Sequence, residues 1–93
     1  MDSPDPTLLV VDDEEFNRKL LVRQLNKEGY PNIDVAENGQ QALEMIRLTG
    51  YDLVMMDIEM PEMSGIELLE ILKSDMRLRD VPVIMISGVE EMD

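Results

Sequence analysis

The sequence predicts a doubly wound α/β fold, in which helices cover both faces of a parallel sheet. Three runs of four apolar residues have the composition of strands buried on both faces, namely Leu8–Val11, Leu53–Met56 and Val83–Ile86. Segments with apolar residues at helical spacing lie between the strands. The resulting order of strand, helix, strand, helix, strand, helix, strand is typical of a parallel sheet with right-handed crossovers.

The composition limits the chain to one domain and restricts the classes of molecule that it can bind. Of its 93 residues 44% are hydrophobic and 3% aromatic, so we expect a core of aliphatic and methionine side chains. The net charge of -13, from 21 acidic and 8 basic residues, argues against nucleic acid or an anionic membrane as a direct partner. The same charge favours bound cations or the basic surfaces of other proteins.

Cysteine and histidine are both absent from the sequence. A chain without cysteine has no disulfide and no thiolate metal site, so we expect a cytoplasmic location. A chain without histidine lacks the commonest general base and transition-metal ligand. No apolar run approaches the roughly 18 residues of a transmembrane helix, and no signal-peptide pattern is present. We expect residues 1–6 to be a disordered tail and residues 7–93 to form the domain.

The first strand ends at two adjacent carboxylates, Asp12 and Asp13. Acidic Glu14 and Glu15 follow, and acidic residues in a first helical turn are favourable at the positive end of the helix dipole. The sequence then predicts a helix that Gly29 ends as its C′ residue. The apolar residues at helical spacing in this segment are Phe16, Leu20, Leu21 and Leu25.

The second strand and helix are predicted by a change of pattern. Residues Asn32–Ala36 alternate between polar and apolar, which suits an edge strand with one wet face. Asn38 is expected to cap the next helix, with Gln41 reaching back, and Gly50 is expected to end it. The expected inner face of this helix consists of Ala42, Leu43 and Ile46.

The third strand, Leu53–Met56, leads to Asp57 and then to a loop that contains Pro61. Ser64 and Glu67 form a predicted capping box at the start of a third helix. The residues expected to face the sheet from that helix are Ile66, Leu69, Leu72 and Met76, with Leu68 widening the stripe. The chain breaks at residues 80–82, before the fourth strand.

Side chains with oxygen ligands follow the three buried strands: Asp12 and Asp13, then Asp57, then Ser87. If these strands are neighbours, the four side chains meet at the edge of the sheet where open α/β sheets bind ligands. Clustered carboxylates need a cation to stay ionised at low cost, and Mg²⁺ accepts carboxylates, waters and a phosphate as ligands. A carboxylate beside Mg²⁺ can attack phosphorus, which would give an aspartyl phosphate that a nearby hydroxyl could stabilise.

Simpler interpretations exist for each of these residues. Asp12 or Asp13 could cap the first helix, and Ser87 could be a turn hydroxyl. The nine methionines could form a peptide-binding surface, although several lie in predicted core strands, where packing is the simpler role. No glycine-rich phosphate loop is present, which argues against nucleotide binding.

Three segments resemble the receiver domain of bacterial two-component response regulators. They are Leu-Val-Val-Asp-Asp at 9–13, Asp-Leu-Val-Met-Met-Asp-Ile-Glu-Met-Pro-Glu-Met-Ser-Gly at 52–65, and Val-Pro-Val-Ile-Met-Ile-Ser-Gly at 81–88. The resemblance covers essentially the whole chain after Pro6. It implies a CheY-like fold, related to flavodoxin, with strand order 2-1-3-4.

The resemblance also implies roles for individual residues. Asp57 would accept a phosphoryl group from a histidine kinase or a phosphotransfer protein. Mg²⁺ would be bound by Asp13 and Asp57, with Asp12 contributing largely through water and the backbone carbonyl of Glu59 completing the protein ligands. Ser87 would be the hydroxyl that turns toward the phosphoryl group and carries the switch. The protein would then be a signalling module and not a free-standing enzyme.

The chain departs from the family pattern near its C-terminus. Receivers continue with a fourth helix, a fifth strand that ends in a phosphate-binding lysine, and a last helix, whereas this sequence ends at Asp93. Lys73, in the third helix, is no substitute for that lysine. We therefore expect an incomplete receiver whose fourth strand is an unprotected edge. The alternative function is an interaction module with impaired phosphotransfer, which pairs or swaps into a homodimer through that strand.

A phosphatase that forms an aspartyl phosphate is a further alternative. Such enzymes are expected to carry an Asp-x-Asp pair after the first strand. Here the corresponding segment, Asp57-Ile58-Glu59, follows the third strand and has glutamate in the second position. The sequence therefore favours the receiver over the phosphatase.

Overall fold

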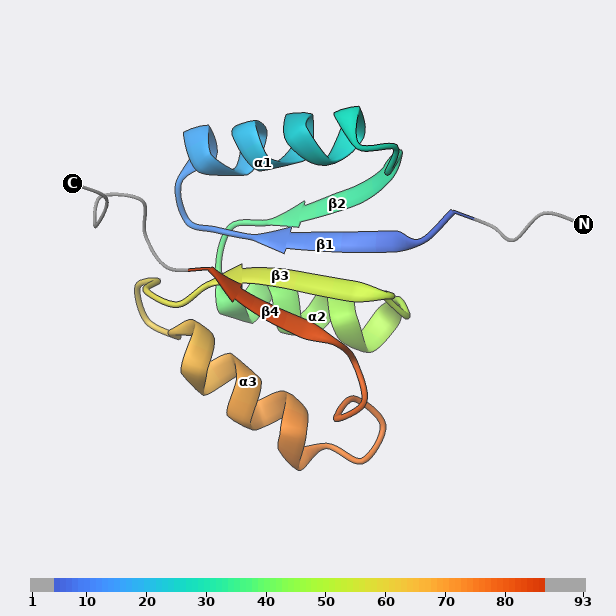
Figure 1. Ribbon diagram of the computed structural model, residues 1–93. Coiled ribbons are helices and arrows are strands. Elements are labelled where there is room, and N and C mark those ends of the chain that lie inside the picture. The colour runs from blue at the N-terminus through green and yellow to red at the C-terminus, as the bar shows by residue number, and fades with distance from the viewer. Residues whose placement is uncertain (1–4, 87–93) are drawn as a thin grey trace, which may run out of the picture.

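The computed structural model describes residues 5–86 as four parallel strands and three helices (Figure 1). The strands are β1 (Thr7–Val11), β2 (Asn32–Ala36), β3 (Leu53–Asp57) and β4 (Val83–Ile86). The helices are α1 (Glu15–Lys27), α2 (Gly39–Leu48) and α3 (Gly65–Ser74). The order across the sheet is β2-β1-β3-β4, which confirms the predicted α/β fold class and strand order.

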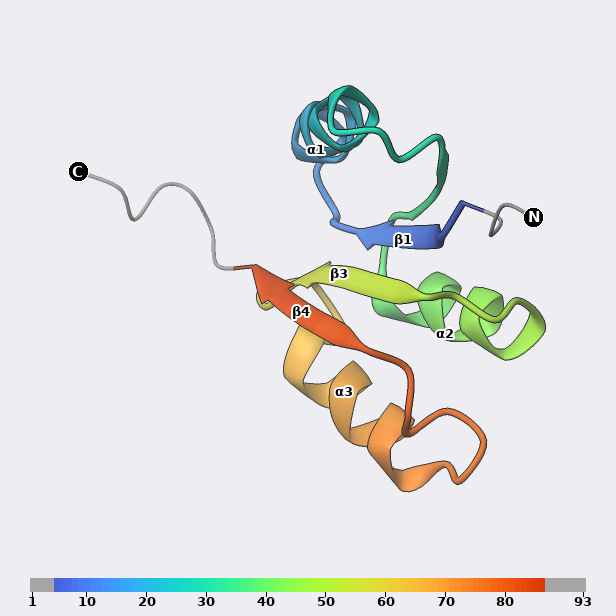
Figure 2. The ribbon, with the colours of Figure 1, turned by 45° about the vertical axis from the view of Figure 1, so that its right-hand side comes forward.

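The helices cover the two faces of the sheet unequally. Helix α1 lies alone over one face, and α2 and α3 lie together over the other (Figures 1 and 2). None of the described helices has the length and apolarity needed to cross a bilayer. The register aligns the strand ends, since Val11 pairs with Met56 and Asp57 pairs with Ile86. The C-terminal ends of β1, β3 and β4 therefore share one edge of the sheet.

The helix starts follow the predicted capping signals. The Asn38 side chain accepts a hydrogen bond from the Gln41 backbone N–H at 2.8 Å, and the Gln41 side chain accepts one from the Glu37 N–H at 2.7 Å. At α3 the reciprocal capping box of Ser64 and Glu67 forms in full. Both helices thus begin where side-chain oxygens satisfy backbone donors that would otherwise lack partners.

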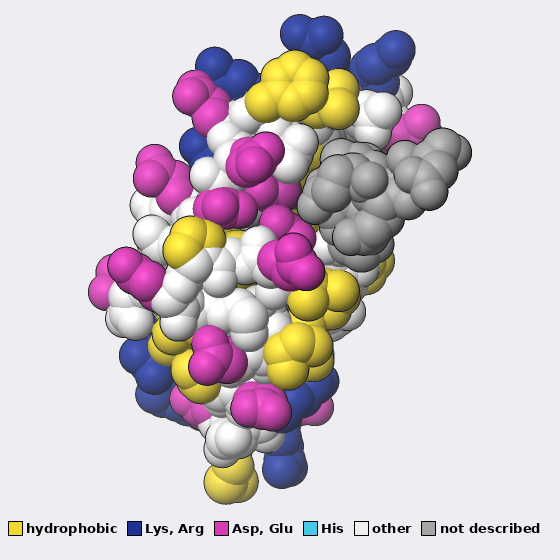
Figure 3. Space-filling model, turned by 90° about the vertical axis from the view of Figure 1, so that its left-hand side faces the viewer, with side chains coloured by type: hydrophobic (Ala, Val, Ile, Leu, Met, Phe, Trp, Pro, Cys, Tyr) yellow, Lys and Arg dark blue, Asp and Glu magenta, His cyan; other side chains and the backbone are white. Residues whose placement is uncertain are grey.

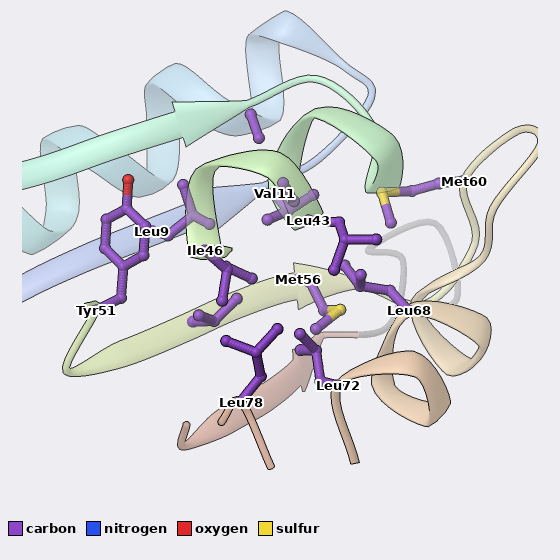
Figure 4. Packing of buried hydrophobic residues seen from close by; sticks show 13 residues of the cluster. Leu9, Val11, Leu43, Ile46, Tyr51, Met56, Met60, Leu68, Leu72 and Leu78 are labelled. Carbon is purple, nitrogen blue, oxygen red and sulfur yellow. The ribbon is translucent and has the colours of Figure 1, made fainter. Parts of the chain in front are cut away.

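The hydrophobic core lies between the sheet and the pair α2 and α3 (Figure 4). Strands β1 and β3 contribute the fully buried Leu9, Val11, Val54 and Met56. The predicted inner face of α2 is confirmed, since Ala42, Leu43 and Ile46 are all buried. This core holds the central strands rigidly and thereby fixes the positions of the residues that follow them.

The predicted inner face of α3 is wrong in part. Leu72 is buried as expected, but the stripe runs through Gly65 and Leu68, whereas Ile66 is 48% exposed and Met76 is 77% exposed. The rotation of the helix is set at its first residue, because the Gly65 N–H donates to the Ile58 carbonyl at 2.8 Å. With Gly65 against the end of β3, positions three and seven residues later face the core and Ile66 faces outward.

The expectation of three strands buried on both faces holds only for β1. Strand β3 alternates between buried and half-buried residues, and in β4 Ile84 is 46% exposed. Strand β1 has a neighbour on each side, whereas β4 has only β3 among residues 5–86. Apolar composition correctly predicted the strands. The burial of their side chains depends on how many elements surround each strand.

Helix α1 shields its face of the sheet only partly. It contains no fully buried residue, and Phe16 is 73% exposed and Leu20 44% exposed. Gly29 has φ +101°, which fits its predicted role at C′. The apolar spacing therefore located the helix correctly, but the sheet contacts only one side of it.

The buried hydroxyl of Tyr51 makes the free energy of unfolding depend on pH in the alkaline range. Its side chain is only 5% exposed, and its hydroxyl donates to Asp34 Oδ2 at 2.6 Å. Burial and the Asp34 carboxylate raise the pKa of Tyr51 from 10.0 to about 12. Because the folded state holds the proton more tightly than the unfolded state, this contribution to stability is complete below pH 10 and is lost as the pH rises to about 12.

We therefore expect urea unfolding of the wild type to show a steeper loss of stability between about pH 10 and about pH 12 than urea unfolding of the Tyr51→Phe variant shows. The variant has no hydroxyl proton at this position, so it reports the contribution of all other groups. Parallel pH profiles for the two proteins would contradict the prediction.

Candidate functional site

The turn after β1 places Asp12 and Asp13 at the edge of the sheet. The Asp12 N–H donates to the Ala36 carbonyl at 3.2 Å, and Asp12 Oδ1 accepts from the Glu14 N–H at 2.9 Å. The N-cap residue of α1 is Glu14, which makes no side-chain capping bond. Neither aspartate is therefore the N-cap of α1, and Asp12 instead orders the turn that precedes the helix.

Helix α1 also contacts this turn through Arg18, a residue that the sequence analysis did not single out. Arg18 Nη1 donates to the backbone carbonyl of Asp12 at 2.7 Å. The guanidinium donates to the main chain of Asp12, whereas the Asp12 carboxylate accepts from the Glu14 N–H. The only signal in the sequence is that the two residues are six positions apart. This separation predicts the contact only once the fold of the turn is known.

Asp57 is the last residue of β3 and is half-buried. Its Oδ1 accepts from the Glu59 N–H at 3.3 Å, and the next residue, Ile58, donates its N–H to the Ile86 carbonyl of β4 at 3.3 Å. The Gly65 N–H closes the loop onto the Ile58 carbonyl. The neighbouring strand and the start of α3 thus fix the backbone next to Asp57.

The structure brings together the three aspartates that the sequence placed at one edge. Asp12, Asp13 and Asp57 each offer a carboxylate oxygen, and these oxygens lie within 4.8 Å of one another. Figure 3 views the molecule from the side where the strands end and shows that acidic side chains are prominent there. Within residues 5–86 the only ion pair is Lys19–Glu15, so no described basic side chain forms an ion pair with these three carboxylates.

The surroundings of Asp57 disfavour its negative charge. Burial raises the pKa of Asp57 above its ordinary value, and the charges of Asp12 and Asp13 raise it further, while the Glu59 N–H acts in the opposite direction. A hard cation among the three carboxylates would offset this repulsion. Three clustered oxygen donors with no histidine or cysteine are a donor set that fits Mg²⁺.

Two further residues considered for the site, Glu59 and Lys73, lie in the described part of the chain. Glu59 is exposed, its N–H faces Asp57, and the metal-binding role of its carbonyl stays a prediction. Lys73 lies in the last turn of α3, where its Nζ donates to the Arg79 carbonyl at 2.8 Å, and that it is no substitute for the family lysine stays a prediction. Ser87 lies outside the described residues.

The loop between Asp57 and α3 contains a left-handed residue that the sequence analysis missed. Glu62 has φ +72°, a conformation that side chains other than asparagine, aspartate and glycine rarely adopt. We expect Glu62→Gly to raise the free energy of unfolding by about 0.5–1 kcal/mol, because glycine adopts this φ without a Cβ clash.

Glu62→Ala is the matched control for this substitution. It removes the carboxylate but keeps the Cβ atom, so it should not be stabilising. Urea unfolding of the three proteins measures both effects, and equal stabilisation by alanine and glycine would show that charge, and not φ, is the cause.

Comparison with known proteins identifies the family of this chain. The family model described as the response regulator receiver domain matches residues 8–93. The polar-differentiation response regulator DivK of Brucella anthropi is 40% identical over 82 residues, which cover 88% of this chain and 66% of that protein. DivK of Brucella ovis is 38% identical over the same shares of the two chains. The chain thus spans slightly less than two thirds of the length of these relatives.

Solved structures give the same result. The N-terminal domain of a response regulator receiver protein from Methanoculleus marisnigri has a TM-score of 0.81 and 41% identity, over 86% of this chain and 64% of that one. A sensor protein from Polaromonas has a TM-score of 0.86 and 28% identity, over 95% of this chain and 70% of that one. From its sequence, its fold and these matches, the chain belongs to the response regulator receiver domain family of two-component signalling.

Proposed function

We propose that this chain accepts a phosphoryl group on Asp57 from a histidine kinase or a phosphotransfer protein, with Mg²⁺ held by the acidic cluster of Asp12, Asp13 and Asp57. The observation that carries the proposal is the approach of these three carboxylates to within 4.8 Å at the edge of the sheet. The protein acts as a phosphorylation switch, and it is a phosphoacceptor and not a free-standing enzyme.

The chemistry follows from the placement of Asp57. A carboxylate oxygen of Asp57 attacks phosphorus, the bond between phosphorus and the donor breaks, and the donor leaves with the bonding electron pair. Asp12, Asp13 and Asp57 would hold the cation, and Mg²⁺ bound there would supply positive charge that offsets the charge of the phosphoryl oxygens and the carboxylates. The Glu59 N–H already donates to Asp57 and helps to fix the orientation of its carboxylate.

Intact-mass spectrometry after incubation with acetyl phosphate tests the proposal. We expect one phosphoryl group per chain in the presence of Mg²⁺ and none in the presence of a chelator. Circular dichroism before and after the reaction establishes that the chain is folded. A folded chain that stays unmodified with Mg²⁺, or that is modified equally well with the chelator, would refute the proposal.

The exposed apolar residues at the start of α1 support docking of the protein donor. Phe16 is 73% exposed and Leu20 44% exposed, and α1 begins at Glu15, two residues after Asp13. Aromatic residues, phenylalanine included, are enriched at the cores of protein interfaces. A donor that covers them would be positioned close to Asp57.

We therefore expect Phe16→Ala to slow phosphotransfer from a histidine kinase on the order of tenfold, since the lost contact is made only with a protein donor. Phosphorylation by acetyl phosphate should stay unchanged. Met76→Ala, which removes an apolar side chain that is 77% exposed beyond α3, is the control. If Phe16→Ala slows phosphorylation by both donors equally, the residue supports the fold of the site and not docking of the protein donor.

A second candidate function is self-association through β4. The observation that favours it is the exposure of Ile84, at 46%, on a strand that pairs only with β3 among the described residues. Open strand edges with apolar side chains are templates for pairing. Light scattering over a range of concentrations tests this: we expect a dimer that Ile84→Lys converts to a monomer. A wild-type monomer at all concentrations would exclude it.

A further inference from the structure

A groove runs between helix α1 and edge strand β2, from Glu15, two residues after the acidic cluster's Asp13, to Lys27 at the other end of α1. It has a volume of about 710 Å³. Its wall is formed by side chains of α1, and Val35 of β2 lies at its other side. Val35 is 42% exposed, and Val22 of α1 is half-buried, so the two valines give the groove an apolar floor.

The groove concentrates positive charge on an otherwise acidic chain. Four of the eight basic residues line it, Arg18, Lys19, Arg23 and Lys27, against one acidic residue, Glu15, which pairs with Lys19. In the part of the chain that the structure describes, Arg23 and Lys27 have no ion-pair partner, although the chain carries 21 acidic residues. Figure 3 shows Lys and Arg side chains at the end of the molecule where α1 lies. The charge of this groove is therefore complementary to an acidic ligand.

The length of the groove matches an extended peptide. Its lining residues run from Glu15 to Lys27, which is about 18 Å along a helix axis at 1.5 Å per residue. A strand of five to six residues has about the same length, and β2 itself has five residues. Within residues 5–86, β2 pairs with β1 alone, so its outer edge can accept a further strand.

The spacing along α1 also defines a side-chain pattern. Arg18 lies about 6 Å before Val22 along the helix axis, and Lys27 lies about 7.5 Å after it. Alternate residues of a strand are about 6.6 Å apart on one face. If a peptide strand places an apolar residue over Val22, its residues two positions before and two positions after that one lie next to basic side chains.

We propose that this groove binds an extended acidic peptide segment of a partner protein, with the pattern acidic-x-apolar-x-acidic, as an added strand on β2. A second copy of this chain is a poorer occupant, because its open strand β4, Val83–Ile86, has no acidic side chain to meet the basic residues of the groove. An anionic membrane is disfavoured because its extended negative surface would also face the rest of this acidic chain, whereas a short peptide meets the groove alone. The proposal concerns the side of α1 that faces β2 and does not depend on phosphorylation of Asp57.

The test is an NMR titration of the ¹⁵N-labelled chain with a blocked pentapeptide that has glutamate at its first and fifth positions, valine at the third and threonine at the second and fourth. We expect chemical-shift changes at Asn32–Ala36 and along α1, and slower amide exchange in β2. Replacing both glutamates by glutamine in the peptide should weaken binding on the order of tenfold, and so should raising the salt concentration.

The double variant Arg23→Gln/Lys27→Gln should lose affinity to the same extent, on the order of tenfold. The control is Arg77→Gln/Arg79→Gln, which changes the net charge equally at exposed positions outside the groove and should bind as the wild type does. The proposal is wrong if both double variants bind alike or if the glutamine peptide binds equally well. It is also wrong if residues of β2 show no chemical-shift change, or if anionic vesicles bind to the chain and the peptide does not.

Discussion

Replacement of Asp57 by asparagine is expected to abolish phosphorylation, with at least a hundredfold loss of phosphoryl incorporation. The amide is nearly the same size as the carboxylate but is not a nucleophile toward phosphorus. Among the three clustered aspartates, Asp12 and Asp57 are both half-buried, but only Asp57 is the last residue of β3, so no other carboxylate occupies its position. Intact-mass spectrometry with acetyl phosphate and Mg²⁺ measures the loss.

The same variant should be more stable than the wild type in the absence of Mg²⁺. Asp57→Asn removes one of three like charges that share a small site, which is worth on the order of 1 kcal/mol. Asp80→Asn, which removes an exposed charge at the opposite end of the sheet, is the control and should change neither property. Phosphorylation that persists in Asp57→Asn would move the acceptor to another residue, and destabilisation would show that the cluster is not repulsive.

Gly65→Ala is expected to lower the free energy of unfolding by about 1–3 kcal/mol and to slow phosphorylation. A Cβ atom at position 65 would clash with the Asp57 carbonyl oxygen and would lie 3.1 Å from the Ile58 Cα, and both are backbone atoms. The backbone cannot rotate away as a side chain can, so either α3 or the end of β3 must shift. A shift of the end of β3 would move Asp57 relative to Asp12 and Asp13.

Gly50→Ala is the matched control, because a Cβ atom there would have no neighbour within 4 Å. It should leave phosphorylation unchanged and alter stability little. Urea unfolding and the rate of phosphorylation by acetyl phosphate measure the two effects. If Gly65→Ala were as stable as Gly50→Ala, the close packing of α3 against β3 would not be a requirement of the fold.

The capping signals and the apolar runs made most of the fold predictable. Asn38 with Gln41 and Ser64 with Glu67 mark helix starts because short polar side chains satisfy free backbone donors. The convergence of Asp12, Asp13 and Asp57 followed from a simple rule, since carboxylates after neighbouring parallel strands share one edge. Local chemistry and topology were enough for these conclusions.

Burial was less predictable, because it depends on which elements surround each side chain. Ile66 and Leu68 are both apolar and two positions apart, yet the contact of Gly65 with the end of β3 turns Leu68 inward and Ile66 outward. Ile84 has the composition of a core strand but lies on a strand with one described neighbour. No pattern within either segment contains this information.

The sequence by itself determined the alternation of strands and helices, the helix caps and the identity of the acidic residues at the strand ends. These features depend on residues that are close together along the chain. The tertiary structure alone decided the rotation of α3, the exposure of Phe16, the left-handed Glu62 and the groove between α1 and β2. The physical reason is that each of these depends on contacts, or on the lack of contacts, between segments that the chain brings together only when it folds.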